Sequence, residues 1–176
     1  MKIESVENIK TEILSEKIAT RRNFPKSIVP KFDDLYTEIV TQIETLVISS
    51  ECILFDSVDA INENKEYSDI TYWTEESTEE EIDSYWLFAQ SGQGDFWVFD
   101  VNSKVYFHDH DHGYFDKKYA VDLGLDFSKW LQFAYLNKEL DELYDTDEVT
   151  DTALEEYKSK LAELSTLLLE NYPYEI

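Results

Sequence analysis

Three short aromatic-rich runs follow one another in the middle of this chain, and they constrain its fold more than any other feature. They span residues 85–90, 95–101 and 104–109, and they are separated by Ser-Gly-Gln-Gly at 91–94 and by Asn-Ser at 102–103. Aromatic and β-branched residues favour strands, whereas clusters of Gly, Asn and Ser favour tight turns. The pattern therefore predicts an antiparallel meander of three strands.

The hydrophobic period changes after residue 126. Phe127, Trp130, Leu131 and Ala134 recur three and four residues apart, which is the spacing of one helix face. We therefore expect the sheet to be followed by an amphipathic helix.

Apolar spacing also predicts helices on both sides of this region. Residues 3–13 indicate a short first helix, and the stripe from Leu35 to Val47 indicates a second of about four turns. A last helix is predicted over residues 152–172, with a capping-box pattern from Thr152 to Glu155 and Pro173 after its end. Between these helices we expect a buried strand at 51–58, a polar loop at 59–66 and a short strand at 68–73.

Composition sets the size and class of the fold. With 176 residues, 43% of them hydrophobic and 15% aromatic, the chain has enough apolar surface for the core of one domain. We predict an α+β single domain over residues 1–176, in which a twisted antiparallel sheet is covered by N-terminal and C-terminal helices. Residues 1–13 hold no apolar run of signal-peptide length, and no stretch is long enough to span a membrane, so a cytoplasmic location is expected. The single cysteine, Cys52, lies in an apolar run and is expected to be a core residue.

The charge is strongly acidic and unevenly distributed. The formal net charge is −24, yet residues 1–31 hold seven Lys or Arg and four Glu, so a basic N-terminal segment of net +3 precedes 145 residues of net −27. Such a field repels nucleic acid and anionic lipid and attracts cationic partners. We therefore expect no nucleic-acid binding, no membrane binding and a basic protein as partner.

Two acidic groups are the candidate partner-binding residues. Carboxylates in such number cannot be buried without partners, so both groups are predicted to lie in solvated loops, where side chains can meet another protein. The first choice lies before the meander and the second lies after the long helix. The residues are Glu75, Glu76, Glu79, Glu80, Glu81 and Asp83, then Asp145, Asp147 and Glu148.

All three histidines lie in His108-Asp109-His110-Asp111-His112. Alternate residues of a strand share a face, so the three imidazoles could project together, and His and carboxylate are both zinc ligands, but the favoured interpretation is a polar strand end that leads into a loop. A tetrahedral site needs a fourth ligand from elsewhere, and the chain has no other histidine. We therefore predict no metal site and no cofactor, with a metal-dependent enzyme as the alternative. No phosphate-binding loop or nucleophile motif is present.

The middle of the chain carries a set of motifs in a definite order. Gly-x-Gly-Asp at 92–95 joins the first two strands, Asp-His at 109–110 follows the third, and a Leu-x-Phe-x-x-Trp-Leu pattern begins the helix at residue 125. Over residues 82–136 this order resembles the SUKH superfamily. The sequence differs from the family pattern at Ala89, where members usually have Gly, and it has Val29-Pro30 and residues 49–51 where members have Leu-Pro and Asn-Gly-Gly. The motif residues are Gly92, Gly94, Asp95, Asp109, His110 and Trp130.

The resemblance implies a function, because SUKH proteins of bacteria are largely immunity proteins against secreted toxins. It implies a non-enzymatic protein that binds and neutralises a cognate toxin, and the acidic charge suggests a basic nuclease-type toxin domain. The superfamily also contains a fungal regulator of cell-wall synthesis, so a regulatory interaction scaffold is a further alternative. A monomer is expected, because one C-terminal helix of about four turns is more readily packed within its own domain than paired with a second copy.

Overall fold

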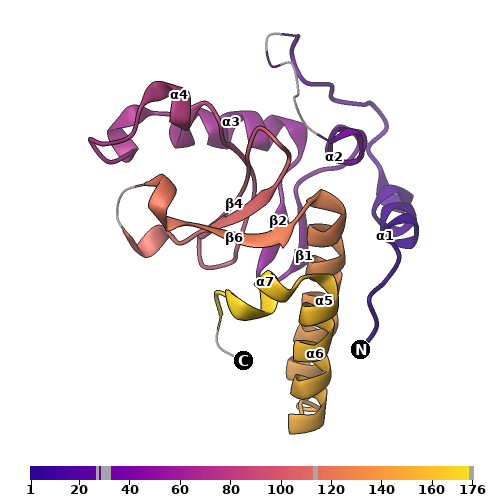
Figure 1. Cartoon of the computed structure of the whole chain (residues 1–176). Helices are drawn as coiled ribbons and strands as arrows, with labels where there is room; N and C mark the ends of the chain where they lie inside the picture. Colours follow the sequence, from indigo (N-terminus) through magenta and orange to yellow (C-terminus); the bar gives the residue numbers. More distant parts are fainter. Residues whose placement is uncertain (27, 29–32, 113–114, 175–176) are drawn as a thin grey trace.

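Six strands form one antiparallel sheet in which every strand pairs with its neighbour in the sequence (Figure 1). The computed structural model describes residues 1–26, 28, 33–112 and 115–174. The strands are β1 (Leu46–Ser49), β2 (Cys52–Leu54), β3 (Trp86–Gln90), β4 (Phe96–Phe99), β5 (Val105–His108) and β6 (Ala120–Leu125). The α+β prediction is confirmed.

Helices cover both faces of this sheet. The α-helices are α1 (Val6–Ile13), α2 (Asp34–Val40), α3 (Ser57–Tyr67), α4 (Glu79–Ile82), α5 (Phe127–Asp145), α6 (Asp151–Leu164) and α7 (Thr166–Glu170). The short 3-10 helices are η1 (Leu14–Glu16), η2 (Ile70–Tyr72), η3 (His110–His112) and η4 (Lys117–Tyr119). Buried side chains from α1, α2, α5, α6 and α7 share one hydrophobic core with the sheet, and those from α3 and α4 share a second core.

The predicted meander is β3, β4 and β5, and its alternation explains the two cores. Trp97 and Phe99 of β4 belong to the large core under α5, whereas Phe96 and Val98, which alternate with them, contact the smaller core under α3. Successive side chains of a strand point to opposite faces, so a sheet that is apolar on both must be covered on both. The predicted helix after residue 126 is confirmed as α5.

The region from residue 35 to 73 corrects three predictions. The long helix is wrong beyond Val40, because the chain turns there and residues 46–49 pair with β2 as strand β1. The polar loop predicted at 59–66 is helix α3, which the Asp56 side chain caps by accepting hydrogen bonds from two backbone amides. The strand predicted at 68–73 is the 3-10 turn η2, with one bridge from Trp73 to Phe115.

The strand predicted at 51–58 is confirmed only over β2, where Cys52 is buried as expected. No element was predicted for residues 120–125, which form β6. Val29-Pro30 lies outside the described residues.

Asn64 explains why the polar segment 57–67 folds as a helix against the sheet. Its side chain accepts a hydrogen bond from the Leu87 backbone amide at 2.9 Å and donates to the Leu87 carbonyl at 2.6 Å. Leu87 lies at an irregularity in the β3–β4 register, where the ladder is interrupted. A buried backbone group without a partner costs about 1–3 kcal/mol, so this amide stabilises both the helix and the irregular strand.

The C-terminal prediction is correct in outline and wrong in its boundaries. Asp145, predicted to lie in a solvated loop, is the last residue of α5, and Asp141 in the same helix accepts hydrogen bonds from the backbone and side chain of Ser50. Thr150, and not Thr152, caps α6. The helix predicted over 152–172 is divided at Ser165 into α6 and α7.

The turn between β3 and β4 contains two glycines with different constraints. Gly94 has φ of +99°, a conformation that residues with a Cβ rarely adopt. A Cβ on Gly92 would lie 2.8 Å from the Ser50 carbonyl oxygen, so that position is limited by space. Ser91 closes the turn, because its hydroxyl oxygen accepts from the Asp95 amide and its hydroxyl donates to the Asp95 carboxylate.

Gly94→Val should therefore destabilise the protein through backbone strain, since the φ is unfavourable for valine and no atom lies within 4 Å of the added Cβ. We expect a loss of about 1–3 kcal/mol in the free energy of unfolding, measured by urea denaturation. Gly94→Asn should lose less, because Asn tolerates positive φ better than a β-branched residue. Equal stability of the valine variant and the parent would show that the turn has another conformation.

Candidate functional site

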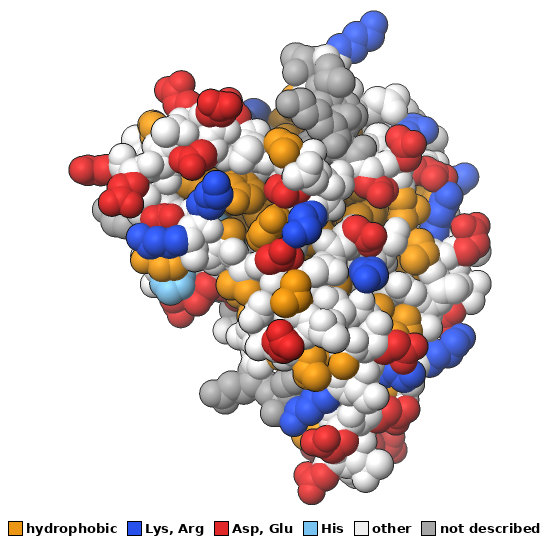
Figure 2. Space-filling model, in the orientation of Figure 1, with side chains coloured by type: hydrophobic (Ala, Val, Ile, Leu, Met, Phe, Trp, Pro, Cys, Tyr) orange, Lys and Arg blue, Asp and Glu red, His pale blue; other side chains and the backbone are white. Residues whose placement is uncertain are grey.

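The first acidic group lies on an exposed one-turn helix and the loop before it. Glu75, Glu76, Glu79, Glu80 and Asp83 are exposed, and we call them the α4 acidic surface. In Figure 2 acidic side chains gather at the upper left, where Figure 1 places α4. The predicted solvated loop is thus partly helical.

A capping box and one buried residue hold this helix in place. The Glu81 carboxylate accepts from the Thr78 amide, and the Thr78 hydroxyl oxygen accepts from the Glu81 amide, both at 3.2 Å. Ile82 is buried in the second core. Glu81 is therefore a structural residue of α4 and differs from its exposed neighbours, with Lys117 as an additional ion-pair partner at 3.8 Å.

Exposed apolar side chains lie next to the α4 acidic surface, and the sequence analysis did not identify them. Ile70 is 49% exposed and Tyr72 is 45% exposed. A hollow of about 650 Å³ is lined by Ile70, Trp73 and Glu75, with Thr71, Thr74 and Ser77 between them. The only sequence signal was Asp69, whose side chain caps η2 by accepting from the Thr71 amide. Apolar anchors within a charged rim are the usual anatomy of a protein interface.

The second acidic group is remote from the first. Asp145, Asp147 and Glu148 are exposed at the turn between α5 and α6, and Figure 1 shows this turn at the opposite end of the molecule from α4. Asp147 has φ of +55°, which Asp tolerates better than most residues. The structure therefore does not bring the two groups into one surface.

The three histidines do not share a strand face, which is the arrangement that the zinc alternative required. β5 ends at His108, and the chain then turns into η3. His108 is buried among the aromatic side chains on the α3 side of the sheet, where its Nδ1 lies 3.4 Å from the Tyr67 hydroxyl. Burial lowers the pKa of His108 to about 4, and His112 contributes to the shift. His112 stacks on Tyr119 with ring centroids 3.9 Å apart.

His110 and Asp95 join the two motifs of the meander. The His110 Nδ1 atom lies 2.7 Å from the Asp95 carboxylate, and the His110 backbone amide donates to the same oxygen at 3.3 Å. The carboxylate holds the pKa of His110 above its usual value. Asp95 is buried, so this pair links the β3–β4 turn to the end of β5.

Asp95, Asp109 and His110 offer three ligand atoms within 4.8 Å of one another, the one such group among the described residues. These atoms suit a divalent cation, but His110 and Asp95 already form a close hydrogen bond and no fourth side chain joins them.

Trp130, the remaining motif residue, is fully buried in the large core.

We expect zinc to bind this group weakly. Titration of the metal-free protein with Zn²⁺, followed by calorimetry, should give no site tighter than about micromolar, because a structural zinc site normally has four ligands. Asp109→Asn serves as the matched variant. A tight site of about one zinc per chain that Asp109→Asn removes would contradict the expectation.

His108 and His110 should give the free energy of unfolding opposite dependences on pH. The unfolded chain protonates His108 near pH 6.5 but the folded chain only near pH 4, so stability should fall by on the order of 3 kcal/mol as the pH falls through that window. The raised pKa of His110 contributes stability that is fully present below pH 6.5 and is lost as the pH rises through the folded value.

Urea denaturation at a series of pH values separates the two effects. His108→Phe, which suits the surrounding aromatic side chains, should reduce the loss of unfolding free energy at acidic pH and leave the alkaline side unchanged. His110→Gln should remove the contribution that is lost on the alkaline side. If neither variant changes the pH dependence of the unfolding free energy in the range expected for it, other groups cause that dependence.

Comparisons with known proteins do not identify a family: no family model, no curated protein and no solved structure matches this chain. Among the described residues, no helix has both the length and the apolar character needed to cross a membrane.

Proposed function

We propose that this chain is a SUKH-like immunity protein that binds and neutralises a cognate toxin, and that the α4 acidic surface makes the contact. The observation that carries the proposal is the position of these carboxylates. Glu79 and Glu80 are exposed on helix α4, whose capping box and buried Ile82 fix its backbone, and the other carboxylates lie on the loop before it and at its end, beside the exposed side chains of Ile70 and Tyr72. A rigid acidic surface with apolar anchors suits a basic protein partner.

The proposed partner is a nuclease-type toxin domain. Such enzymes carry basic surfaces that bind the phosphate backbone, so an acidic protein can bind the same surface and exclude the nucleic-acid substrate. The net charge of −24 steers a basic partner during encounter and disfavours nucleic acid itself as the ligand. Neutralisation requires no catalysis and no cofactor, and it takes place in the cytoplasm of the producing cell with the protein as a monomer.

Two further features support the family assignment within this proposal. The antiparallel meander of β3, β4 and β5 agrees with the strand pattern on which the SUKH resemblance rests, although the additional strand β6 precedes α5. The hydrogen bond between Asp95 and His110 gives its Gly-Asp and Asp-His motifs a shared structural role.

The test is charge reversal on α4 with the capping box preserved. Glu79→Lys/Glu80→Lys should slow association with the toxin encoded by the neighbouring gene by about tenfold or more at low ionic strength, and should weaken the dependence of the rate on salt. The melting temperature should change little, since both side chains are exposed. Stopped-flow binding and growth of cells that express the toxin measure the effect.

Two variants serve as controls. Glu81→Gln keeps the capping pattern, so it should retain the fold of α4 while removing one charge. Asp145→Lys/Glu148→Lys makes the same charge change at the other end of the molecule. If this second variant alone loses protection, the contact lies at the α5–α6 turn. If no toxin is bound at all, the alternatives of a regulatory scaffold or an enzyme replace immunity.

A further inference from the structure

Strand β1 leaves one edge of the sheet open. It is the terminal strand in the order from β1 to β6, and among the described residues no backbone hydrogen bond joins it to a strand beyond. Val47 in its middle is 67% exposed, the largest exposure among the large hydrophobic residues described as exposed. An edge strand presents unpaired amide and carbonyl groups to which another chain can add as a strand.

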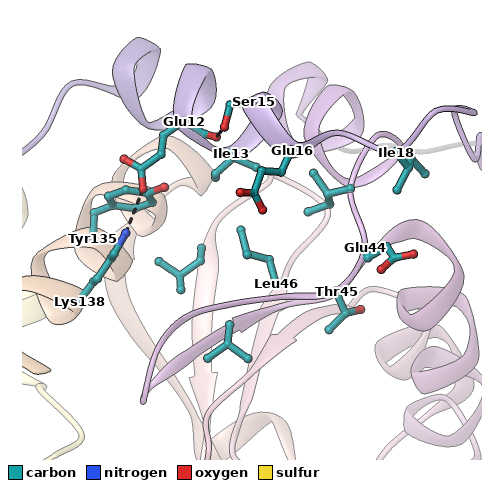
Figure 3. Close-up of a pocket in the computed structure, with 13 residues that line it drawn as sticks. Glu12, Ile13, Ser15, Glu16, Ile18, Glu44, Thr45, Leu46, Tyr135 and Lys138 are labelled. Atoms are coloured by element: carbon teal, nitrogen blue, oxygen red, sulfur yellow. Dashed lines mark hydrogen bonds and ion pairs between the residues drawn. The ribbon is translucent and has the colours of Figure 1, made fainter.

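A pocket of about 460 Å³ lies along this edge, between β1, η1 and α5 (Figure 3). Its apolar lining comes from Ile13, Ile18, Ile43, Leu46, Val47 and Ile48. The volume falls within the range of pockets that bind small ligands and side chains. A strand added to β1 would therefore find apolar contacts as well as backbone partners.

Carboxylates surround the pocket. Glu12, Glu16 and Glu44 line it together with one cation, Lys138, which already pairs with Glu12 at 2.9 Å. Arg22, outside the lining, pairs with Glu44 at 3.5 Å, so Glu16 is the carboxylate least neutralised by neighbouring cations. Figure 3 shows Glu16 extending from η1 toward the hollow above Leu46. The charge around the site favours a segment that carries Lys or Arg next to its apolar residues.

The same charge argues against a second copy of this chain as the occupant. Pairing of two β1 edges would bring the exposed carboxylates of Glu16 and Glu44 from both copies to one interface, and like charges brought together are unfavourable even though Glu44 has Arg22 as an ion-pair partner. A strand of four residues with an irregular register between Val47 and Ser49 also offers little ladder for self-association.

We propose that β1 and this pocket form a binding site for an extended segment of a partner protein that alternates apolar and basic residues and adds to the sheet as a seventh strand. The site shares no residue with the α4 acidic surface, and it extends beyond the proposed function because it does not depend on immunity. The apolar side chains of the segment occupy the pocket and its cations approach Glu16 and Glu44.

The probe is a capped peptide of about eight residues that alternates lysine and valine. In heteronuclear NMR spectra it should shift the amide resonances of Leu46–Ser49 and slow their hydrogen exchange, because the strand backbone gains partners. Glu16→Lys/Glu44→Lys should weaken binding by about tenfold or more. The matched control, Asp145→Lys/Glu148→Lys, makes the same charge change elsewhere and should bind the peptide as the parent does.

Several outcomes would overturn the site. One is an equal loss of affinity in the control variant, which would mean that the peptide responds only to net charge. Others are shifts confined to residues 75–83, or equal binding of a peptide with glutamate in place of lysine. A dimer in sedimentation that Val47→Lys dissociates would show that a second copy is the occupant. None of these measurements involves the toxin, so they fail or succeed independently of the proposed function.

Discussion

The aromatic contact between α5 and the middle of the sheet supports the rest of the structure. Trp130 of α5 meets the edge of Phe88 at 4.9 Å between ring centroids, and Phe88 stacks on Phe99 at 4.1 Å. Phe133, one turn later on the helix, contacts Trp97 at 5.5 Å. Large aromatic side chains dominate core energetics, so this layer fixes where α5 lies. The helices α1, α6 and α7 then complete the same core.

The opposite face depends on a polar interaction. The Asn64 side chain bonds both backbone groups of Leu87, where the hydrogen bonds between strands are interrupted. These bonds attach α3 to the sheet, although the apolar spacing of α3 does not predict a helix. Tyr67 at the end of α3 and Trp73 after η2 both pack against His108. The same layer buries Ile82 and so positions α4. The fold and the proposed recognition surface are thus separable, since buried groups hold the backbone while exposed carboxylates are free for a partner.

Two surfaces of different chemistry result from this architecture. The α4 acidic surface presents charge beside a few exposed apolar side chains, and the β1 pocket presents backbone groups and apolar lining with a carboxylate rim. Both suit cationic proteins, because the chain carries 39 acidic residues against 15 basic ones. The two proposed sites differ in the feature that a partner would recognise, which is charge at α4 and unpaired backbone groups of an edge strand at β1.

The sequence by itself determined the elements whose patterns are local. Turn residues at 91–94 and 102–103 delimited the meander, and regular spacing from Phe127 onward identified α5, since hydrophobic period and turn chemistry act over a few residues. It also indicated the exposed acidic groups. Tertiary structure decided the region from residue 41 to 73. There an apolar stripe continued past Val40 although the chain turns, and a polar segment formed α3 because a distant strand supplied partners for Asn64. The histidine cluster was likewise decided by fold, because the end of β5 at His108 placed one imidazole in the core and one against Asp95. These outcomes depend on partners far away in the chain, and no local pattern contains them.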